Sequence, residues 1–352
     1  MSKFLNKRYK QLEAYVPGEQ PRDMKYIKLN TNESPYPPSD ATVQAVSSEE
    51  ALKLNLYPDP SCIDLKNILA QRYSLLPENV FVSNGSDDIL NFAFMAFAGL
   101  GGKAIFPDIT YGFYEVFCRL HGVEYEKIPL DEDFNIAKED YMKDSAMIAI
   151  ANPNAPTGLV LKKSDIEEIV RANPNHVVLI DEAYIDFGGE SCTELVKKYP
   201  NLLVVQTFSK SRALAGARLG FAFAGAELIA DLEKIKYSTN PYSINRLTLN
   251  AGIAAVKSDL YYMANCGEII KTREFCKEEL RKLGFFVTDS KANFLFARSD
   301  AVSGSTLYEK LRKKGILVRH FSAERIEDYN RITIGTPQQM EAFLTAVNEI
   351  LK

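Results

Sequence analysis

Short apolar runs alternate with amphipathic stretches through the middle of the chain. The runs cover residues 80–83, 103–107, 146–153, 176–184, 201–208 and 219–224. Helical spacing of apolar residues is found between several of them, as in Ser86–Phe97, Tyr111–His121 and Ser164–Ala172. Continuous apolar strands that alternate with helices are typical of a mainly parallel sheet covered on both faces. The pattern therefore predicts an α/β fold with helices on both sides of the sheet.

The pattern differs at the two ends of the chain. A long helical stretch over Arg246–Leu283 is followed by strand-like runs at 285–290, 293–299, 316–321 and 331–335, with helices between and after them. The first 35 residues are polar and read as an extended arm, and prolines at 35, 37 and 38 exclude a helix at its end. We therefore predict an N-terminal arm (1–35), a large domain (36–245) and a smaller C-terminal α+β domain (246–352).

Composition limits the classes of partner. The chain has 352 residues, of which 46% are hydrophobic and 25% charged, and its net charge is -4. No broad basic surface is implied, so we expect neither nucleic acid nor a membrane as a partner. The first 20 residues lack the apolar core of a signal peptide, which favours the cytoplasm. Five scattered cysteines without a C-x-x-C motif, and three distant histidines, favour buried reduced thiols and no metal site.

Ligands of such sheets bind at the carboxyl ends of the parallel strands. The first run is followed by Gly85, Ser86 and Asp87 at the start of a predicted helix. Free N–H groups at a helix N-terminus can hold a phosphate. The same residues are also common in an ordinary helix cap, which is the more frequent role of such a sequence.

Asp181 ends the apolar run at 176–184, and Tyr184 follows it. A carboxylate at the buried end of a strand is costly unless it has a cationic partner. A protonated pyridine nitrogen would be such a partner, and an arginine in a structural ion pair is the alternative.

Lys210 follows the run at 201–208, between Thr207 and Ser209 on one side and Arg218 on the other. Desolvation and neighbouring cations favour the neutral, nucleophilic amine, which condenses with aldehydes. The two hydroxyls and the guanidinium suit a phosphate dianion. The alternative, a surface lysine, is the usual fate of this residue type, but it does not explain these neighbours.

The order of the motifs resembles the fold-type I aminotransferases that depend on pyridoxal 5'-phosphate (PLP). They are N-G-S-D, T-Y-G-F-Y, N-P-N-A-P-T-G, D-E-A-Y and T-F-S-K-S-R-A-L-A-G-A-R, and they extend over much of the chain. Within that group, L-N-T-N-E-S-P-Y-P-P, Y-P-D-P and R-I-T-I-G-T are similar to the histidinol-phosphate aminotransferase family.

The resemblance implies a role for each motif. Lys210 would carry PLP and move the proton during catalysis, Asp181 would pair with the ring nitrogen, and Tyr184 would contact the ring's phenolic oxygen. Tyr111 would stack on the ring. The phosphate would be bound by Gly85, Ser86, Asp87, Thr207, Ser209 and Arg218. Tyr57 would reach the phosphate in a neighbouring subunit, which implies a homodimer.

The substrate residues follow from the same resemblance. Arg331 would bind the anionic group of the substrate, assisted by Arg319. Tyr15, Asn32 and Glu33 would line the entrance; the alternative for all five is an ordinary exposed side chain. One departure concerns the cofactor: where the family has asparagine before a proline, this chain has Ala155, and Asn154 could substitute for it.

The resemblance implies transamination between histidinol phosphate and 2-oxoglutarate, which yields glutamate. Threonine-phosphate decarboxylase and an aromatic or broad-range aminotransferase are alternatives, because a fold does not fix its substrate. A PLP-binding module without activity is disfavoured, because Lys210, Asp181 and Arg218 are all present.

Overall fold

A central sheet is built from the predicted apolar runs in the computed structural model, which describes residues 4–6, 9 and 12–352. Over these residues the sheet has seven strands in the order β2-β8-β7-β6-β5-β3-β4. The strands are β2 (Val80–Ser83), β3 (Lys103–Pro107), β4 (Glu124–Ile128), β5 (Met147–Ala151), β6 (Val178–Asp181), β7 (Leu202–Thr207) and β8 (Gly220–Ala224). Neighbouring strands are parallel except for β8, which is antiparallel to β2 and β7. The predicted α/β class is confirmed.

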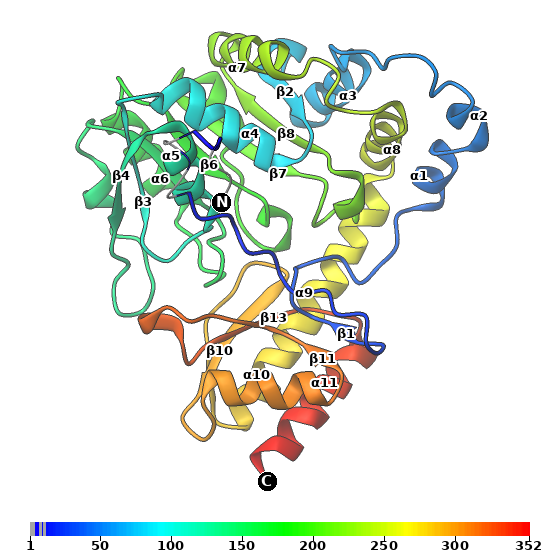
Figure 1. Ribbon diagram of the computed structural model, residues 1–352, viewed down its shortest axis with the longest axis vertical. Helices are drawn as coiled ribbons and strands as arrows, with labels where there is room; N and C mark the ends of the chain where they lie inside the picture. Colours follow the sequence, from blue (N-terminus) through cyan, green and yellow to red (C-terminus); the bar gives the residue numbers. More distant parts are fainter. Residues whose placement is uncertain (1–3, 7–8, 10–11) are drawn as a thin grey trace.

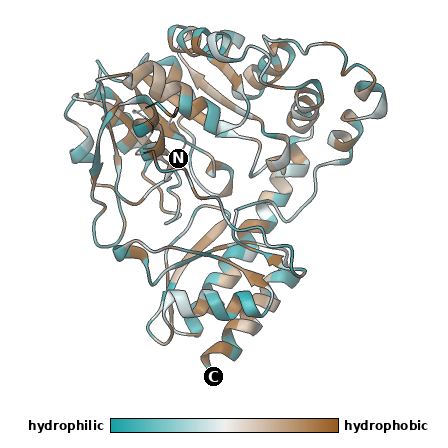
Figure 2. Ribbon diagram, viewed as in Figure 1, coloured by the Kyte–Doolittle hydropathy of each residue, from teal (hydrophilic) through white to brown (hydrophobic). Residues whose placement is uncertain are grey.

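Helices cover both faces of this sheet (Figure 1). Because successive side chains of a strand point to opposite faces, Val80 and Val82 pack in one core and Phe81 in the other. The first core also contains side chains of α3 (Ile63–Tyr73), α6 (Lys163–Ala172) and α8 (Arg246–Lys257). The second contains side chains of α4 (Ser86–Ala93), α5 (Phe113–His121) and α7 (Ala226–Thr239). Figure 2 shows apolar strands between helices that turn polar faces outward.

A smaller unit follows in the sequence (Figure 1). Its antiparallel sheet has the order β12-β13-β10-β9. The strands are β9 (Phe285–Val287), β10 (Phe294–Ser299), β12 (Arg319–His320) and β13 (Asn330–Thr333). One face packs on α9 (Asp259–Lys282), α10 (Gly304–Lys313) and α11 (Pro337–Leu351). Near the N-terminus, β1 (Ile27–Lys28) pairs in parallel with β11 (Ile316–Leu317), which ties the arm to this unit. Residues 1–3, 7–8 and 10–11 of the predicted arm lie outside the described residues.

The helical stretch predicted over Arg246–Leu283 is two helices, because the chain breaks at Ser258 (φ -93°, ψ 26°) between α8 and α9. The apolar side chains of α8 and Tyr262 of α9 belong to the core of the large sheet, whereas Cys266 of α9 belongs to the core of the smaller unit. The two cores therefore meet along α9. Two short helices, α1 (Asp40–Ala45) and α2 (Ser48–Ala51), precede α3.

Three further findings concern membrane-spanning helices, metal sites and the cysteines. In the described part of the chain, none of the helices combines the length and apolar character needed to span a membrane. Within the same residues, no group of three or more His, Cys, Asp and Glu side chains is placed to bind a metal ion. All five cysteines are buried and none forms a disulfide, which confirms the expectation of buried reduced thiols.

Candidate active site

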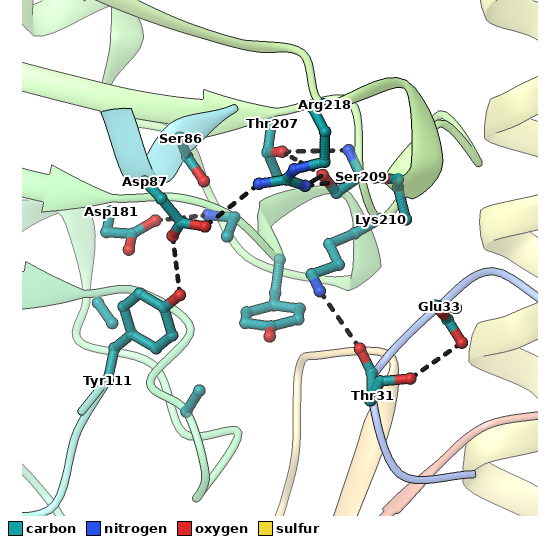
Figure 3. A pocket seen from close by; sticks show the side chains of 15 residues that line it. Thr31, Glu33, Ser86, Asp87, Tyr111, Asp181, Thr207, Ser209, Lys210 and Arg218 are labelled. Atoms are coloured by element: carbon teal, nitrogen blue, oxygen red, sulfur yellow. Dashed lines mark hydrogen bonds and ion pairs between the residues drawn. The ribbon is translucent and has the colours of Figure 1, made fainter. Parts of the chain in front are cut away.

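A cavity of about 260 Å³ opens at the edge of the sheet where the parallel strands end (Figure 3). Its walls come from the ends of β6 and β7, the start of α4, and the segment after β1. The predicted residues that line it are Glu33, Ser86, Asp87, Tyr111, Asp181, Tyr184, Thr207, Ser209, Lys210 and Arg218. Residues far apart in the sequence are thus brought together where the fold class predicts a ligand.

Lys210 extends into this cavity from the loop after β7 (Figure 3). Its Nζ lies 3.5 Å from the carbonyl oxygen of Thr31, to which it donates, and 5.6 Å from the centre of the Tyr184 ring. No carboxylate lies within ion-pair distance of this amine in the described part of the chain. The amine is thus only weakly bound and can react with a ligand in the cavity.

Asp181 is held at the end of β6, where its side chain is almost fully buried. Burial raises the pKa of this carboxyl to about 6, although hydrogen bonds from the Tyr114 hydroxyl and the Ala183 amide act in the opposite direction. Tyr114 donates to Oδ2 over 3.1 Å, and the Ala183 N–H donates to Oδ1 over 3.2 Å. The carboxylate is therefore oriented but lacks a cation, so a ligand with a protonated nitrogen would stabilise it.

Arg218 lies on the other side of the cavity, next to the hydroxyls of Thr207 and Ser209. Its Nη1 donates to Ser209 Oγ over 3.3 Å, and its Nη2 pairs with Asp87 over 3.2 Å. Tyr111 donates to the other oxygen of Asp87 over 2.8 Å. Burial and the Asp87 carboxylate raise the pKa of Tyr111 well above its ordinary value, so the phenol stays neutral. Two hydroxyls, a guanidinium and a helix N-terminus converge here, which suits a phosphate.

Two glycines permit the close approach of chain segments at this point. Gly85 has φ +86°, and a Cβ there would lie 2.6 Å from Arg218 Nη2. Gly220 starts β8, and a Cβ there would lie 2.4 Å from the Ser86 nitrogen. The start of α4 and the Arg218 side chain can therefore meet only because both positions lack a side chain.

Tyr184 is held by residues of the arm. Its hydroxyl accepts a hydrogen bond from Asn32 Nδ2 over 3.0 Å, and its ring packs edge-on against Phe294. Asn32 is itself fixed by Thr333, whose Oγ1 donates to Asn32 Oδ1 over 2.9 Å. Asn32 is buried, and it also lines the second cavity described below. Glu33 does line the cavity, and despite burial the Lys28 ammonium and Thr31 hydroxyl hold its pKa below the usual range.

A second cavity of about 320 Å³ adjoins the first, and Lys210, Tyr111 and Tyr184 line both. The predicted substrate residues Tyr15, Asn32, Arg319 and Arg331 are also part of its wall. Tyr15 stacks on Phe113 with ring centres 4.1 Å apart. The arm therefore closes one side of this cavity.

Arg331 brings a partly buried positive charge to the second cavity. Its guanidinium lies 5.4 Å from the ring centre of Phe294 and donates from Nη2 to the carbonyl oxygen of Asn30 over 3.1 Å. Burial lowers the pKa of Arg331, and the nearby Arg319 acts in the same direction. Neither arginine forms an ion pair with an acidic residue among those described. Two guanidinium groups without an acid beside a cavity have the chemistry that suits an anion.

Three of the predicted residues are part of neither cavity wall: Gly85, Asn154 and Tyr57. The amide of Asn154 donates to the Ile109 carbonyl oxygen and to Thr157, and it accepts from Thr110. Ala155 lines both cavities instead, and the Asn154 amide is bound by residues of the neighbouring loops. Tyr57 lies elsewhere on the surface, with 77% of its area exposed.

Several residues of the site were not predicted, among them Thr31, Tyr114 and Phe321. Thr31 accepts from Lys210, Tyr114 donates to Asp181, and Phe321 lines the second cavity. Tyr114 stands three residues after Tyr111 in T-Y-G-F-Y and lies in the first turn of α5, whereas Tyr111 precedes this helix. A buried hydroxyl there needs a partner, so this signal was available in the sequence. Thr31 and Phe321 have no such signal.

The sequence of the chain matches known proteins over nearly its whole length. The profile of the family described as aminotransferase class I and II matches residues 24–347. The histidinol-phosphate aminotransferase of Brachyspira hyodysenteriae is 50% identical, and the alignment covers 100% of both chains. The protein of the same name from Clostridium acetobutylicum is 48% identical, again with 100% of both chains covered.

Solved structures have the same fold. A crystal structure of histidinol-phosphate aminotransferase from Clostridium acetobutylicum is 26% identical, with a TM-score of 0.85 over 92% of this chain and 98% of that one. The Sinorhizobium meliloti enzyme of that name, solved in complex with pyridoxal-5'-phosphate, has a TM-score of 0.85 at 21% identity, over 93% of this chain and 91% of that one.

Proposed function

Because the chain belongs to the aminotransferase class I and II family, we propose that it transfers the amino group of histidinol phosphate to 2-oxoglutarate, with PLP as its cofactor. The choice of substrate rests on the pair Arg319 and Arg331. These arginines have no acidic partner among the described residues, and they line the cavity next to Lys210. The names of the relatives at 46–50% identity point to the same substrate.

The first cavity fits PLP in the chemistry of its donors. A phosphate suits the hydroxyls of Thr207 and Ser209, the guanidinium of Arg218 and the N-terminus of α4. A protonated ring nitrogen suits the buried Asp181 carboxylate, and an aldehyde suits the amine of Lys210. Bound PLP supplies an electron-withdrawing ring that stabilises negative charge on the substrate carbon next to the amine.

The residues of the chain carry out the remaining work. Nζ of Lys210 moves the proton to and from the substrate carbon that bears the amine, which requires its neutral form. Arg331 and Arg319 orient the substrate through its anionic group, so that this carbon faces Lys210. Tyr15, stacked on Phe113, restricts access of water from the side of the arm. Either a phosphate or the distal carboxylate of the second substrate can be bound by the two arginines.

We further propose that the enzyme acts as a homodimer in which Tyr57 of one subunit reaches the PLP phosphate of the other. Tyr57 lines neither cavity of its own chain and is 77% exposed. It follows three exposed leucines, Leu52, Leu54 and Leu56. A second copy of the chain would cover these apolar side chains.

A half-reaction tests the function. Purified protein loaded with PLP is mixed with histidinol phosphate alone, and the visible absorption of the lysine-linked cofactor is followed. We expect this absorption to be lost and to return when 2-oxoglutarate is added. Protein that shows the absorption but does not respond to histidinol phosphate would contradict the substrate, and threonine phosphate would be tried next with detection of carbon dioxide. Protein that never binds PLP would contradict the whole proposal.

A further inference from the structure

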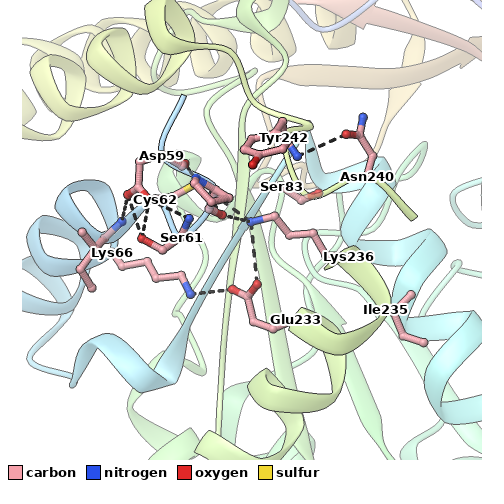
Figure 4. Close-up of polar contacts among 12 residues, drawn as sticks. Asp59, Ser61, Cys62, Lys66, Ser83, Glu233, Ile235, Lys236, Asn240 and Tyr242 are labelled. Carbon is pink, nitrogen blue, oxygen red and sulfur yellow. Dashed lines mark hydrogen bonds and ion pairs between the residues drawn. The ribbon is translucent and has the colours of Figure 1, made fainter. Parts of the chain in front are cut away.

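A buried lysine outside both cavities contacts the loop that carries Tyr57 (Figure 4). Lys236 lies in α7, and only 1% of its side chain is exposed. Its Nζ donates to the carbonyl oxygen of Pro60 over 3.2 Å. The ammonium also lies 5.7 Å from the ring centre of Phe81 and 5.8 Å from that of Tyr237. This lysine is thus enclosed by aromatic rings and by residues of the loop.

The charge of Lys236 is only partly compensated. Glu233 is its acidic neighbour at 3.8 Å, and the same carboxylate binds Lys66 at 2.6 Å (Figure 4). Burial of an ammonium is costly, and replacement of buried charged groups by apolar side chains is often neutral or stabilising. Fold stability alone therefore does not explain a lysine at this position, and its shortest polar contact is with the loop.

The loop from Tyr57 to Cys62 is stiff and is held at two points. Pro58 and Pro60 fix two of its φ angles. Asp59 accepts from the backbone N–H groups of Ser61 and Ile63 over 2.9 and 3.0 Å. Arg246 donates from Nη2 to the Tyr57 carbonyl oxygen over 3.4 Å. Lys236 and Arg246 therefore fix the backbone carbonyls at the two ends of one short rigid segment.

The side chain of Tyr57 is displayed from this segment without being buried. Its ring stacks on Tyr242 with the centres 4.5 Å apart and an angle of 25° between the planes. A side chain that must reach a ligand outside its own subunit has to be fixed from behind, because its far end must remain free. The arrangement of Lys236 and Arg246 meets this requirement.

We propose that Lys236 is a positioning residue that holds the Tyr57 loop in the conformation in which Tyr57 reaches the cofactor phosphate of the partner subunit. The inference rests on the proposed function, in which Tyr57 makes this contact. It assigns a role in cofactor binding to a residue that touches neither the cofactor nor the substrate. Its effect is exerted in the site of the other subunit.

Affinity for PLP gives the first test. We expect Tyr57→Phe and Lys236→Met each to raise the Kd of PLP about tenfold, the usual size for loss of one hydrogen bond to a charged group. The double variant should be no weaker than the single ones, since both act through the same hydroxyl. Lys66→Met is the matched control: it removes a charge from the same Glu233, but its ammonium makes no hydrogen bond to residues 57–62, all of which are described. It should leave the Kd unchanged.

Hybrid dimers give the second test. Two chains with different tags allow the hybrid to be purified, and the absorption of lysine-linked PLP reports cofactor binding. In one hybrid, Lys236→Met stands in one subunit and Lys210→Ala in the other. The remaining Lys210 then receives Tyr57 from an intact loop, and normal affinity is expected. In the other hybrid, both substitutions stand in one subunit beside an unmodified partner. Its Lys210 receives Tyr57 from the altered loop, and the tenfold weaker affinity is expected.

The outcomes separate this inference from the proposed function. Weak affinity in the first hybrid and normal affinity in the second would show that Lys236 acts within its own subunit, and would overturn the inference alone. A normal Kd for Lys236→Met beside a raised one for Tyr57→Phe would do the same. A monomeric protein, or a normal Kd for Tyr57→Phe, would overturn both the inference and the proposed contact of Tyr57. If Lys236→Met does not fold, Arg246→Met is used in the same hybrids, because it releases the other end of the loop.

Discussion

The buried carboxylate of Asp181 shows how a single residue is prepared for a ligand. It lies at the end of a buried strand, with two hydrogen-bond donors and no cation of the chain beside it. Burial raises its pKa to about 6. In the folded protein without ligand, its charge is therefore unfavourable at neutral pH, and a protonated ring nitrogen would remove that penalty.

Asp181→Asn is expected to stabilise the cofactor-free protein at neutral pH. The folded pKa of about 6 exceeds the unfolded value of 3.8, so the parent protein loses stability as the pH rises from about 4 to above 6. The variant carries no such charge and should gain on the order of 2–3 kcal/mol over the parent at pH 8 and almost nothing at pH 4. Denaturant unfolding at both pH values measures this difference. A variant that is less stable than the parent at pH 8 would contradict it.

Lys210→Ala is expected to abolish turnover and leave the fold intact. The side chain is partly exposed in the cavity, and its one hydrogen bond is long, at 3.5 Å, so little stability depends on it. Loss of the amine that is placed to move the proton should lower the rate by at least about 10²-fold. Steady-state kinetics and far-UV circular dichroism provide the two measurements. A near-normal rate would rule out the mechanism.

Arg331→Ala is expected to raise the KM for histidinol phosphate and for 2-oxoglutarate together, by roughly 10- to 100-fold, because one charged hydrogen-bonding group is lost from both complexes. PLP binding should not change, since Arg331 lines only the second cavity. Arg298→Ala is the control, since Arg298 pairs with Asp300 at the surface. Weaker PLP binding with unchanged KM values would show that Arg331 binds the cofactor and not the substrate.

At the scale of elements, the junction of β8 with the start of α4 places the phosphate site. Gly220→Ala is expected to destabilise the protein by about 1–3 kcal/mol and to weaken PLP binding, because the new Cβ would lie 2.4 Å from the Ser86 nitrogen and push the start of α4 away. Gly216→Ala is the matched control in the preceding loop, where a Cβ meets no atom within 4 Å. Thermal unfolding and PLP titration measure the two effects. Equal behaviour of both variants would contradict the crowding argument.

The strands that could be predicted from the sequence are the ones buried on both faces. All six runs predicted for the large sheet became strands, because apolar side chains are needed in both cores. Strand β4 was not predicted: it lies at the edge of the sheet, and its sequence EYEKI exposes three charged residues. An edge strand tolerates such charges, so β4 lacks the apolar signal that the buried strand β2 keeps at the other edge.

The site residues were predictable where a strand end carried reactive chemistry, as at Asp181 and Lys210. They were not predictable where tertiary packing determines which side chain faces the cavity. The neighbours Asn154 and Ala155 differ in sequence by one position, yet the backbone of their loop directs the amide inward and the methyl group to the cavity. The break at Ser258 was not predictable for the same reason. The residue that follows it, Asp259, forms an ion pair with Arg212, which is distant in the sequence.

At the scale of the whole molecule, the arm connects the two units across the second cavity. Tyr15 stacks on Phe113 of the large unit. Four residues later, Glu19 accepts from the Tyr308 hydroxyl over 2.5 Å and pairs with Arg312 over 3.1 Å, both on α10 of the smaller unit. The position of Tyr15 therefore depends on how both units are placed.

Glu19→Ala is expected to raise the KM for histidinol phosphate several-fold with little change in PLP affinity, because the arm loses its anchor on α10 and Tyr15 becomes less well ordered. Glu349→Ala is the control, since it removes a comparable surface pair between Glu349 on α11 and Lys314 at the end of α10. Steady-state kinetics and PLP titration of the two variants give the answer. An unchanged KM would mean that Tyr15 holds the arm without Glu19.

The burial of every cysteine has a practical consequence for observing such movements. Burial raises the pKa of the thiols of Cys118, Cys266 and Cys276 to about 12. Maleimide dyes react with exposed thiolates, so the native side chains should stay unlabelled in the folded protein. Cysteines introduced at Leu100 in the large unit and Phe286 in the smaller one, which are 81% and 46% exposed, would then accept a donor and an acceptor fluorophore. Distances between the two units could thus be followed in solution without removal of any native cysteine.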